Sequence, residues 1–383
     1  MAGAIVIEGH VQGLSNTRSL GELGIPVYVI DTGHCLAQHS RYCKKHFRCP
    51  PFNSQEFIDF LLSLARKEKL EGWLLIGSND HVVENLSLNE NRLQPYYRLL
   101  VPHPSQLYEI INKKNLLKVA AECGTSIPET CYPEQLELAR HFRYPLLVKG
   151  NLGLTFYKST HKKAIQVEDY QHLLDVIDKL HDSVPSDDIM IQELIPRTPR
   201  NEVVSFTCFA ESGDIKTFWM GKKLREHPVR FGTATCAESV YEEEVLQEAI
   251  PLVKALNYSG VCEIEFMLDE RDGKYKLIEI NPRTWLWVGL AKACGVDYAK
   301  MMYRHVNGIP QAFPKKYDIG IKWINWITDV FFGMQAIGKG ILKTGEYFRS
   351  LKGRKVKAVW SWKDPVPGIV FPFMLFYIAR KRG

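Results

Sequence analysis

The sequence predicts a multidomain protein in which an open α/β domain precedes a region of α+β class, followed by a basic, apolar helical tail. Three observations support this prediction. Strands and helices alternate over residues 1–105, the pattern of βαβ units on a parallel sheet. Residues 261–283 read as a β-hairpin with acidic strands. Residues 312–383 combine apolar helical spacing with many Lys, Arg and Trp residues.

The N-terminal domain is predicted from hydrophobic periodicity and from glycine and proline boundaries. Its strands and helices are, in order, Ala4–Glu8, Asn16–Leu23, Ile25–Asp31, Ser54–Lys69 and Trp73–Gly77. The loop after the first strand contains Gly9 and Gly13 but lacks GxGxxG spacing, so we do not expect a nicotinamide dinucleotide site. Asp80 follows the last of these strands, where it either lines a crevice or caps the next helix.

Three histidines and three cysteines lie between residues 34 and 49, namely His34, Cys35, His39, Cys43, His46 and Cys49. Zinc sites usually contain closely spaced cysteine pairs, and none is present in this segment. A metal site and an ordinary surface loop with a short strand therefore remain as alternatives.

Two helices follow the first domain, the second after Asn112-Lys113 and ending at Gly124. The strand Tyr144–Lys149 ends in a lysine, which either binds phosphate or is simply exposed. The apolar strand Asp188–Ile195 stops at Pro196. We expect this strand to act as a hinge between a small lid and a larger base.

A basic stretch follows the strand Lys216–Met220 and reads Gly-Lys-Lys-Leu-Arg-Glu-His-Pro over residues 221–228. Lys222, Lys223 and Arg225 would balance charge opposite a phosphate or metal site. A solvated turn is the alternative.

The hairpin places acidic residues on one face. Because side chains alternate along a strand, Glu263 and Glu265 share one face of the first strand, and the other face of that strand is apolar. In the second strand, Ile278 and Ile280 are expected to share one face, with Glu279 and Asn281 on the other. If the turn is symmetric about Asp272, Glu265 faces Glu279 and Glu263 faces Asn281.

Directly opposed like charges destabilise a sheet, so this arrangement calls for a proton, a cation or another register. Carboxylate and amide oxygens suit Mg²⁺ that holds phosphates. A solvated edge with ordinary surface acids is the alternative.

Charge is distributed unevenly along the chain. Residues 311–383 contain fourteen Lys and Arg and four Asp and Glu, a balance of +10, so the remainder must carry −4 for the chain to reach +6. The nine cysteines form no paired framework, which indicates a reducing compartment. The N-terminus has no basic segment before an apolar run, so no signal peptide is expected, and no apolar run is long enough to span a membrane.

The tail predicts an amphipathic helix. Its apolar face is formed by Ile321, Ile324, Ile327, Phe331, Met334 and Ile337, and is widened by Trp323, Trp326 and Val330. A basic stretch and a second apolar segment, 368–379, follow. The tail either attaches peripherally to an anionic membrane or packs on the core or on a second subunit.

Taken in order, these residues resemble the ATP-grasp superfamily of carboxylate–amine ligases. Residues 106–311 carry the resemblance, and 1–105 look like the α/β domain that commonly precedes it. Asn112-Lys113 with Gly124 and Pro128 resembles the superfamily's Asp-Lys…Gly-x-x-x-Pro opening, and Lys149 resembles its second ATP lysine. The resemblance implies a small lid over about 126–195 and a larger antiparallel-sheet subdomain.

The resemblance also implies roles for individual residues. Lys113 and Lys149 would bind nucleotide phosphates. The hinge residues Gln192, Glu193 and Ile195 would bind adenine, and Glu202 would bind ribose. Glu265, Glu279 and Asn281 match the two-magnesium ligand set, and Arg283 matches the arginine that contacts the reacting group.

The basic stretch and Ile-Glu-Ile-Asn-Pro-Arg resemble the branch that includes D-aspartate ligase and the carbamoyl-phosphate synthase large subunit. There, Lys222, Lys223 and Arg225 would line the phosphate and substrate channel. Two segments depart from the family pattern. The loop 150–155 has only two glycines, and the hinge continues Pro-Arg-Thr-Pro-Arg.

The function implied by the resemblance is ATP-dependent joining of a small-molecule carboxylate to an amine. ATP and two Mg²⁺ ions are the expected cofactors, with Mn²⁺ able to substitute. A small-molecule kinase and a non-catalytic nucleotide-binding protein at a membrane remain as alternatives. We expect no nucleic-acid partner, because no binding module accompanies the basic residues. A homo-oligomer is compatible with the sequence, and the expected location is the cytoplasm, at the inner membrane face if the tail binds lipid.

Overall fold

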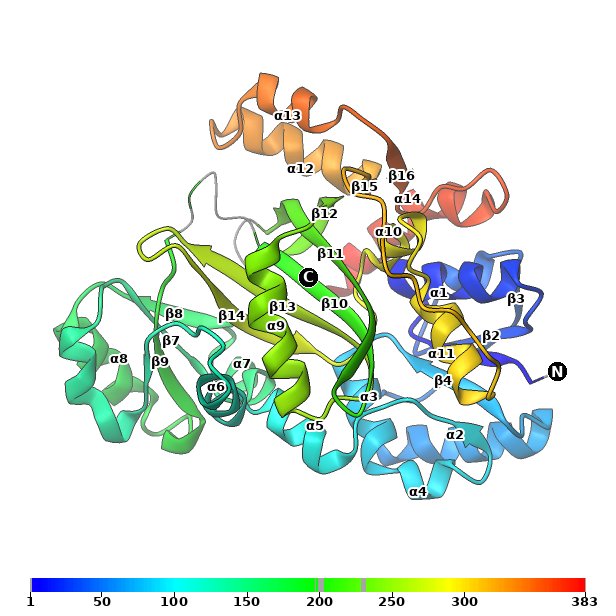
Figure 1. Cartoon of the computed structure of the whole chain (residues 1–383), viewed down its shortest axis with the longest axis horizontal. Helices are drawn as coiled ribbons and strands as arrows, with labels where there is room; N and C mark the ends of the chain where they lie inside the picture. The colour runs from blue at the N-terminus through cyan, green and yellow to red at the C-terminus, as the bar shows by residue number, and fades with distance from the viewer. Residues whose placement is uncertain (1, 197, 199–202, 229–231, 383) are drawn as a thin grey trace.

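The computed structural model describes residues 2–196, 198, 203–228 and 232–382. Three sheets organise these residues, and each belongs to a different unit. Figure 1 shows the three units in a row, with the lid at one end, the long central sheet in the middle and the N-terminal domain at the other end. The predicted combination of an open α/β domain with an α+β region is confirmed.

The N-terminal domain is a parallel sheet of order β3-β2-β1-β4-β5 flanked by helices. Its strands are β1 (Ala4–Ile7), β2 (Val27–Asp31), β3 (Cys43–Arg48), β4 (Trp73–Gly77) and β5 (Tyr97–Arg98). Its helices are α1 (Val11–Glu22), a 3₁₀ turn (Ala37–His39), α2 (Gln55–Glu68), α3 (Asp80–Leu88) and α4 (Glu90–Leu93). Parallel pairing places the carboxyl ends of β1, β2 and β4 at one edge of the sheet, the position at which open α/β sheets usually have a ligand-binding crevice.

The lid is an antiparallel sheet of order β6-β9-β7-β8 with its own apolar core. It follows α5 (Pro104–Ile111) and α6 (Lys113–Glu122). Its elements are β6 (Thr130–Cys131), a 3₁₀ segment (Pro133–His141), β7 (Leu146–Gly150), α7 (Gly153–Thr160), β8 (Ala164–Val167), α8 (Tyr170–Leu180), a 3₁₀ turn (Ser186–Asp188) and β9 (Ile189–Glu193).

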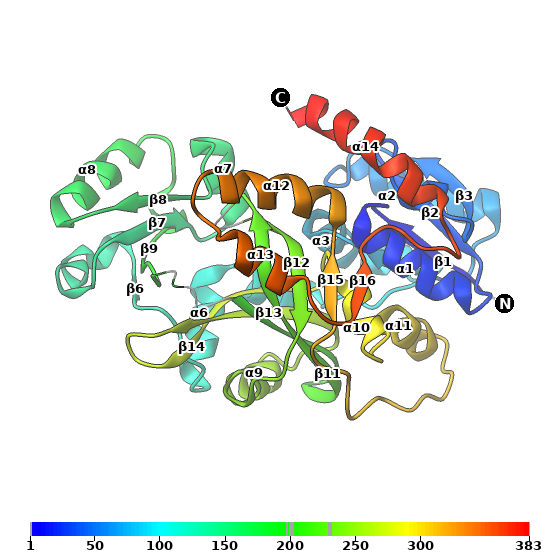
Figure 2. The ribbon, with the colours of Figure 1, turned by 90° about the horizontal axis from the view of Figure 1, so that it is seen from above.

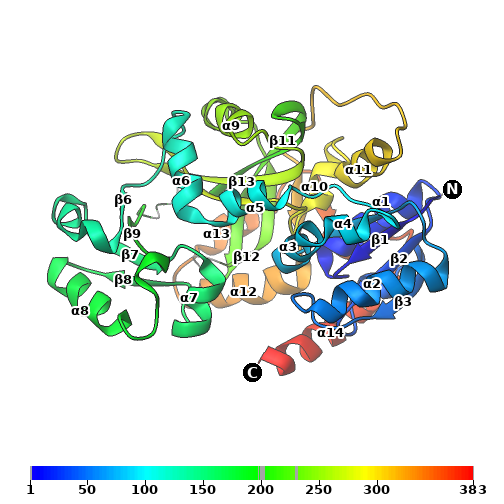
Figure 3. The ribbon, with the colours of Figure 1, turned by 90° about the horizontal axis from the view of Figure 1, so that it is seen from below.

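The central sheet has the order β14-β13-β10-β11-β12-β15-β16. Its first part contains β10 (Val203–Glu211), β11 (Asp214–His227), β12 (Thr233–Ser239), α9 (Glu243–Ala255), β13 (Gly260–Asp269) and β14 (Lys274–Asn281). Helix α9 covers one face and buries an apolar core against β10, β13 and β14. The opposite face packs toward the N-terminal domain, together with α10 (Val288–Ala293) and α11 (Tyr298–Val306). Figure 3 shows α9 and the N-terminal helices in this arrangement.

The C-terminal segment extends the central sheet instead of forming only helices. It contains β15 (Lys322–Ile324), α12 (Trp326–Gly338), α13 (Thr344–Ser350), β16 (Lys355–Lys357) and α14 (Val366–Arg382). Strand β15 pairs with β12, and β16 pairs with β15. Figure 2 shows α12 and α13 lying over the central sheet, next to α14.

The predicted single apolar helix is therefore wrong in its first turn. Ile321 and Ile324 are buried beside and within β15, and the helix begins only at Trp326. Isoleucine and tryptophan suit a strand as well as a helix, and pairing with β12 decides between them. Within the described part of the chain, no helix combines the length and apolar character needed to cross a bilayer.

Candidate active site

The acidic hairpin has the predicted register. Glu265 lies opposite Glu279, and Glu263 lies opposite Asn281, between β13 and β14. A bulge follows, because the next pair is Phe266 with Leu277. Glu263 and Glu265 are both nearly inaccessible to water. The prediction that acids from two strands meet on one face is thus confirmed.

The bulge corrects one expectation about this hairpin. Ile280 packs into the core under α9, whereas Ile278 packs against a small apolar cluster of Ile195, Val203 and Met267. Ile278 and Ile280 therefore do not share an environment. The bulged strand breaks the alternation, which turns Ile278 toward the hinge between lid and base.

Hydrogen bonds connect the acidic side chains to one another and to β10 and β11. The Lys223 ammonium donates to Glu265 Oε1 at 2.7 Å, and the Ser205 hydroxyl donates to Glu263 Oε1 at 2.8 Å. The Asn281 amide donates to Glu263 at 3.2 Å and to Glu279 at 3.3 Å. The opposed carboxylates thus have a cation from a third strand, which the hairpin alone could not reveal.

Burial and crowding change the proton affinity of these groups. Burial, with the neighbouring Glu265 charge, raises the pKa of Glu263 to about 8, against the opposing effect of Lys223. Burial also raises the pKa of Glu265, although Lys223 lowers it. Burial disfavours the charge on Lys223, but Glu265 and Glu263 outweigh it and raise the Lys223 pKa above its ordinary value. A further cation at this face would remove the remaining like-charge repulsion.

Two lysines approach the hairpin, Lys149 from the lid and Lys113 from the start of α6. Lys149 is the penultimate residue of β7, and its ammonium donates to Gln192 Oε1 at 2.7 Å. Burial, together with the positive charge of Lys113, lowers the pKa of Lys149 to about 7, although Glu279 acts in the opposite direction. Lys113, Lys149 and Glu279 are thus close enough to influence one another, as expected for groups around one polyphosphate.

Lys113 is held by the start of α6. The Asn112 side chain caps this helix by accepting the Asn115 N–H at 3.0 Å, and Asn151 accepts the Lys113 and Lys114 N–H groups at 3.3 and 2.7 Å. An amide oxygen caps a helix about as well as a carboxylate does. Asparagine in place of the family's aspartate therefore preserves the local structure.

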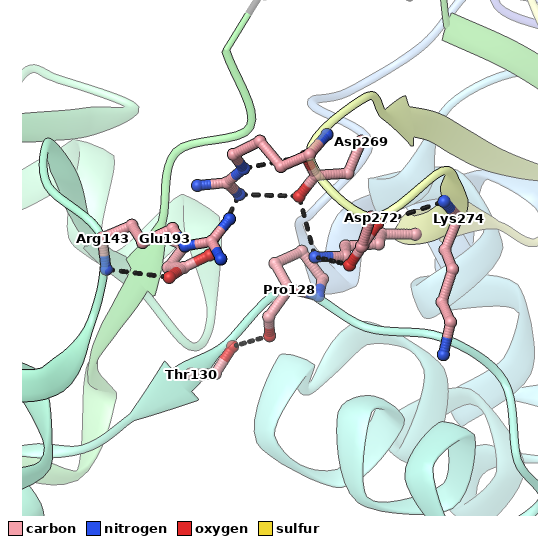
Figure 4. Close-up of polar contacts among 9 residues, drawn as sticks. Pro128, Thr130, Arg143, Glu193, Asp269, Asp272 and Lys274 are labelled. Carbon is pink, nitrogen blue, oxygen red and sulfur yellow. Dashed lines mark hydrogen bonds and ion pairs between the residues drawn. The ribbon is translucent and has the colours of Figure 1, made fainter.

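The hinge uses its polar side chains for structure. Glu193 accepts the Arg143 N–H at 2.9 Å and pairs with Arg271 at 3.0 Å. Arg271 also binds Asp269 in the hairpin turn at 2.6 Å. Figure 4 shows Arg143, Glu193 and Asp269 converging between the lid and the turn. The Glu193 carboxylate thus fastens the lid to the base.

The other two hinge residues are placed differently. The Gln192 amide donates to Thr130 Oγ1 at 2.8 Å while its oxygen holds Lys149. Ile195 is buried in the apolar cluster with Val203 and Met267. Glu202, the predicted ribose residue, lies outside the described residues.

Arg283 joins the hairpin to the N-terminal crevice. Its guanidinium donates to both Asp80 oxygens, at 2.6 and 3.0 Å, and to Asn281 Oδ1 at 3.2 Å. The Asn79 side chain caps α3 by accepting the Val82 N–H at 2.9 Å. The side-chain cap of α3 is therefore Asn79, and Asp80 instead pairs with Arg283.

The crevice contains a further acid that the sequence did not single out. Glu8 follows β1 with a positive φ of 70°. Burial, with the Asp31 charge, raises the pKa of Glu8 to about 7, while Asn79 and Arg283 lower it. The signal available in the sequence was its position at a strand's carboxyl end, the same signal that identified Asp80.

Two predicted catalytic residues lie elsewhere. Lys222 pairs in register with Val204 and so points to the face covered by α9, where its charge acts on Glu242. Register shifts on either side of Arg225 turn its side chain toward α12, where it binds both oxygens of buried Asp329 at 2.8 Å. The structure therefore does not bring Lys222 or Arg225 to the acidic face. Lys223 lies at the acidic face instead. Neighbouring side chains of a strand point to opposite faces, so the sequence could have distinguished Lys223 from Lys222.

The donor set fits magnesium that is shared with phosphates. Glu265, Glu279 and Asn281 present carboxylate and amide oxygens on one face, and Mg²⁺ in nucleotide sites usually takes only one or two carboxylates from the protein. Among the described residues, no group of three or more His, Cys, Asp or Glu residues is arranged to hold a metal, and this covers the cysteine and histidine segment 34–49.

Comparisons with known proteins agree with this geometry. Residues 226–312 match a family model described as the carbamoyl-phosphate synthase L chain ATP-binding domain. D-aspartate ligase of Enterococcus faecium is 24% identical over 242 residues, 59% of this chain and 58% of the relative. The carbamoyl phosphate synthase large chain of Thermoanaerobacter pseudethanolicus is 26% identical over 289 residues, 67% of this chain and 26% of the relative. The chain thus spans less than two thirds of either relative.

Solved structures share the fold at low identity. Biotin carboxylase of Campylobacter jejuni superposes with a TM-score of 0.65 at 14% identity, covering 84% of this chain and 74% of that one. N5-carboxyaminoimidazole synthetase of Staphylococcus aureus gives 0.64 at 13% identity, covering 83% and 80%. The chain is thus similar to carboxylate–amine ligases of the ATP-grasp superfamily, in sequence over part of its length and in fold over most of it.

Proposed function

We propose that the protein is an ATP-dependent ligase that activates a carboxylate as an acylphosphate and joins it to an amine, releasing ADP and phosphate. One observation carries the proposal. Lys149 of the lid is close enough to Lys113 at the start of α6 and to Glu279 of the base for both charges to act on it, and Arg283 lies two residues beyond Asn281. An ATP polyphosphate needs this combination of lysines and metal-binding oxygens.

The nucleotide has a distinct seat in this proposal. Ile195, Val203, Met267 and Ile278 form an apolar surface at the hinge that suits a purine base. The phosphates would then extend toward Lys113 and Lys149. Gln192 holds Lys149 in place, and Glu193 holds the lid to the base.

The chemistry requires positioning and charge balance, with no protein nucleophile. Magnesium bound by Glu265, Glu279 and Asn281 would neutralise phosphate oxygens and align the transferred group. Lys223 keeps Glu265 oriented, and Arg283 would bind the carboxylate that receives the phosphoryl group. Closure of the lid would exclude water from the acylphosphate.

The crevice beside Arg283 supplies opposite charges for the two substrates. The guanidinium suits the carboxylate, while Glu8 and Asp31 at the ends of β1 and β2 suit the ammonium form of an amine before it loses its proton. Asp80 holds Arg283 at the boundary between these regions. The substrates we propose are therefore a small carboxylate and a small amine.

A direct test is a screen for substrate-dependent ADP release across pairs of amino acids and related carboxylates, followed by mass measurement of the product. An amide product supports ligation. A stable phosphorylated product would instead indicate the kinase alternative, and ATP binding with no ADP release under any pair would indicate a non-catalytic nucleotide-binding protein.

A variant pair tests the metal assignment. Glu279→Gln should abolish ATP turnover while the unfolding transition is preserved, because Glu279 lies on the surface and contributes to no apolar core among the described residues. Glu270→Gln, in the exposed turn of the same hairpin, removes the same charge and should leave turnover unchanged. Near-normal ADP release by Glu279→Gln would refute the assignment.

The remaining parts of the proposal concern ions and location. Binding of two ions should give a sigmoidal or biphasic dependence of activity on free Mg²⁺, and Mn²⁺ should restore activity after chelation.

We also propose that the enzyme works in the cytoplasm at the inner face of a membrane, with residues 312–383 as the contact. Light scattering would show whether it forms a homo-oligomer.

A further inference from the structure

The apolar side of helix α12 faces outward. Ile327, Val330, Phe331 and Met334 recur at helical spacing and are exposed, with Phe331 at 66% and Met334 at 56%. In the described part of the protein, no buried apolar cluster includes a residue of α12. A helix in contact with water normally has the opposite arrangement.

Polar contacts hold α12 to the body. Its buried residues are Asp329 and Gly333. Asp329 binds Arg225 through both oxygens and also accepts the Thr235 hydroxyl at 2.9 Å. Gly333 lies against the Tyr347 ring of α13, where a Cβ would be 2.6 Å from the nearest ring atom. The helix is thus fixed in this orientation, and its exposed apolar face is a stable feature.

A second group of outward-facing apolar residues consists of Trp362 and residues in the first half of α14. Trp362, Val366, Ile369 and Phe373 are exposed, with Trp362 at 83% and Phe373 at 74%. The other side of the same helix is buried, through Phe371 and Met374. Figures 2 and 3 show α12 and α14 on the same side of the molecule.

The charges around these apolar residues are almost all positive. Residues 326–375 contain eight exposed Lys and Arg residues, namely Lys339, Lys343, Arg349, Lys352, Arg354, Lys355, Lys357 and Lys363. Of the three acids in this range, Asp329 and Asp364 are buried and paired with Arg225 and Arg18 of the body. Only Glu346 is exposed. The face presented to solvent is therefore apolar and strongly cationic.

We infer that the exposed faces of α12 and α14, with these eight cations, form one docking surface for an anionic lipid bilayer. Apolar side chains would enter the acyl boundary, Trp362 would sit at the headgroup level, and Lys and Arg would bind lipid phosphates. A symmetric pair of chains would bring the same eight cations face to face, which argues against a second copy as the occupant. This inference specifies the membrane contact proposed above and is independent of the ligase reaction.

Vesicle co-sedimentation of the full chain tests the surface without nucleotide or substrate. The protein should bind vesicles that contain phosphatidylglycerol, should bind phosphatidylcholine vesicles far more weakly, and should be released by salt. The double variant Phe331→Ser with Met334→Ser should weaken binding by roughly a hundredfold, as expected when two large apolar side chains no longer leave water. Lys339→Glu with Lys343→Glu should weaken it only for the anionic vesicles.

Matched variants outside the docking surface control for the general effect of removing an exposed apolar side chain or inverting a charge. Leu88→Ser removes an equally exposed apolar residue of α3, and Lys118→Glu inverts an exposed lysine of α6, and both should bind as wild type does. Unchanged ATP affinity and unfolding of the double variant would show that the fold is intact. Equal binding to both vesicle types, unaltered binding by the variants, or a concentration-dependent dimer that Phe331→Ser abolishes would overturn the inference.

Discussion

Nucleotide binding should be coupled to proton uptake at Lys149. Burial and the neighbouring Lys113 charge lower the pKa of Lys149 to about 7, so only about a tenth of the molecules carry this ammonium at pH 8. Phosphate oxygens placed beside the amine favour its charged form and raise the pKa again. Binding at pH 8 should therefore take up about 0.9 proton, compared with about 0.5 at pH 7.

The same shift predicts how affinity depends on pH. Each molecule must gain its proton before the charged contact forms, so the Kd for ATP should rise about fivefold between pH 7 and pH 8, or about 1 kcal/mol. Isothermal titration calorimetry in buffers of different ionisation enthalpy measures the protons taken up, and ADP or ATP without metal can serve as the ligand.

Two variants make this prediction specific. Lys149→Met should bind nucleotide more weakly and without proton uptake. Lys179→Met removes an exposed lysine of α8 in the same lid and should keep the wild-type coupling. The reasoning is refuted if wild type takes up no proton at pH 8, or if Lys149→Met takes up as many protons as wild type.

Three further perturbations follow from the ion pairs. Asp80→Asn should lower kcat/KM for the carboxylate about fivefold with the KM for ATP unchanged, because it frees Arg283 without touching the nucleotide seat; equal losses for both substrates would contradict this. Arg225→Leu leaves the fully buried Asp329 charge unpaired, so hydrogen exchange should report a loss of about 3–5 kcal/mol in α12, and unchanged protection would exclude that role. Burial would raise the pKa of Asp269, but the cations bound to it hold that pKa well below its ordinary value. The Asp269 carboxylate therefore stabilises the folded protein at neutral pH, and this stabilisation is lost as the pH falls below about 4. In urea unfolding, Asp269→Asn should therefore be destabilised at pH 7 and approach wild type in acid.

The paired acids illustrate how much local sequence can decide. Alternation along two strands and a short Asp-Gly turn were enough to place Glu265 opposite Glu279 and Glu263 opposite Asn281, because strand side chains repeat every two residues. The same reasoning failed at Ile278, where a bulge reverses the face, and irregular pairing around Arg225 likewise turns that side chain away from the acidic face. Bulges depend on how neighbouring strands pair, which a single segment does not reveal.

The groups that complete the site come from distant parts of the chain. Lys223 reaches Glu265 from β11, Asp80 reaches Arg283 from the N-terminal domain, and Arg271 reaches the lid through Glu193. The first pair depends on the strand order within the central sheet, and the other two depend on how separate units of the fold pack together. The sequence contained the residues but no information on which would meet.

The sequence by itself therefore determined the open α/β domain, the hinged lid, the acidic hairpin and a basic, apolar C-terminal segment, because these depend on short periodic patterns. Only the tertiary structure decided that part of that segment becomes β15 and β16, and that α12 turns its apolar side outward. The physical reason lies in the buried pair of Arg225 and Asp329, since a buried carboxylate must face its cation and so fixes the rotation of the whole helix.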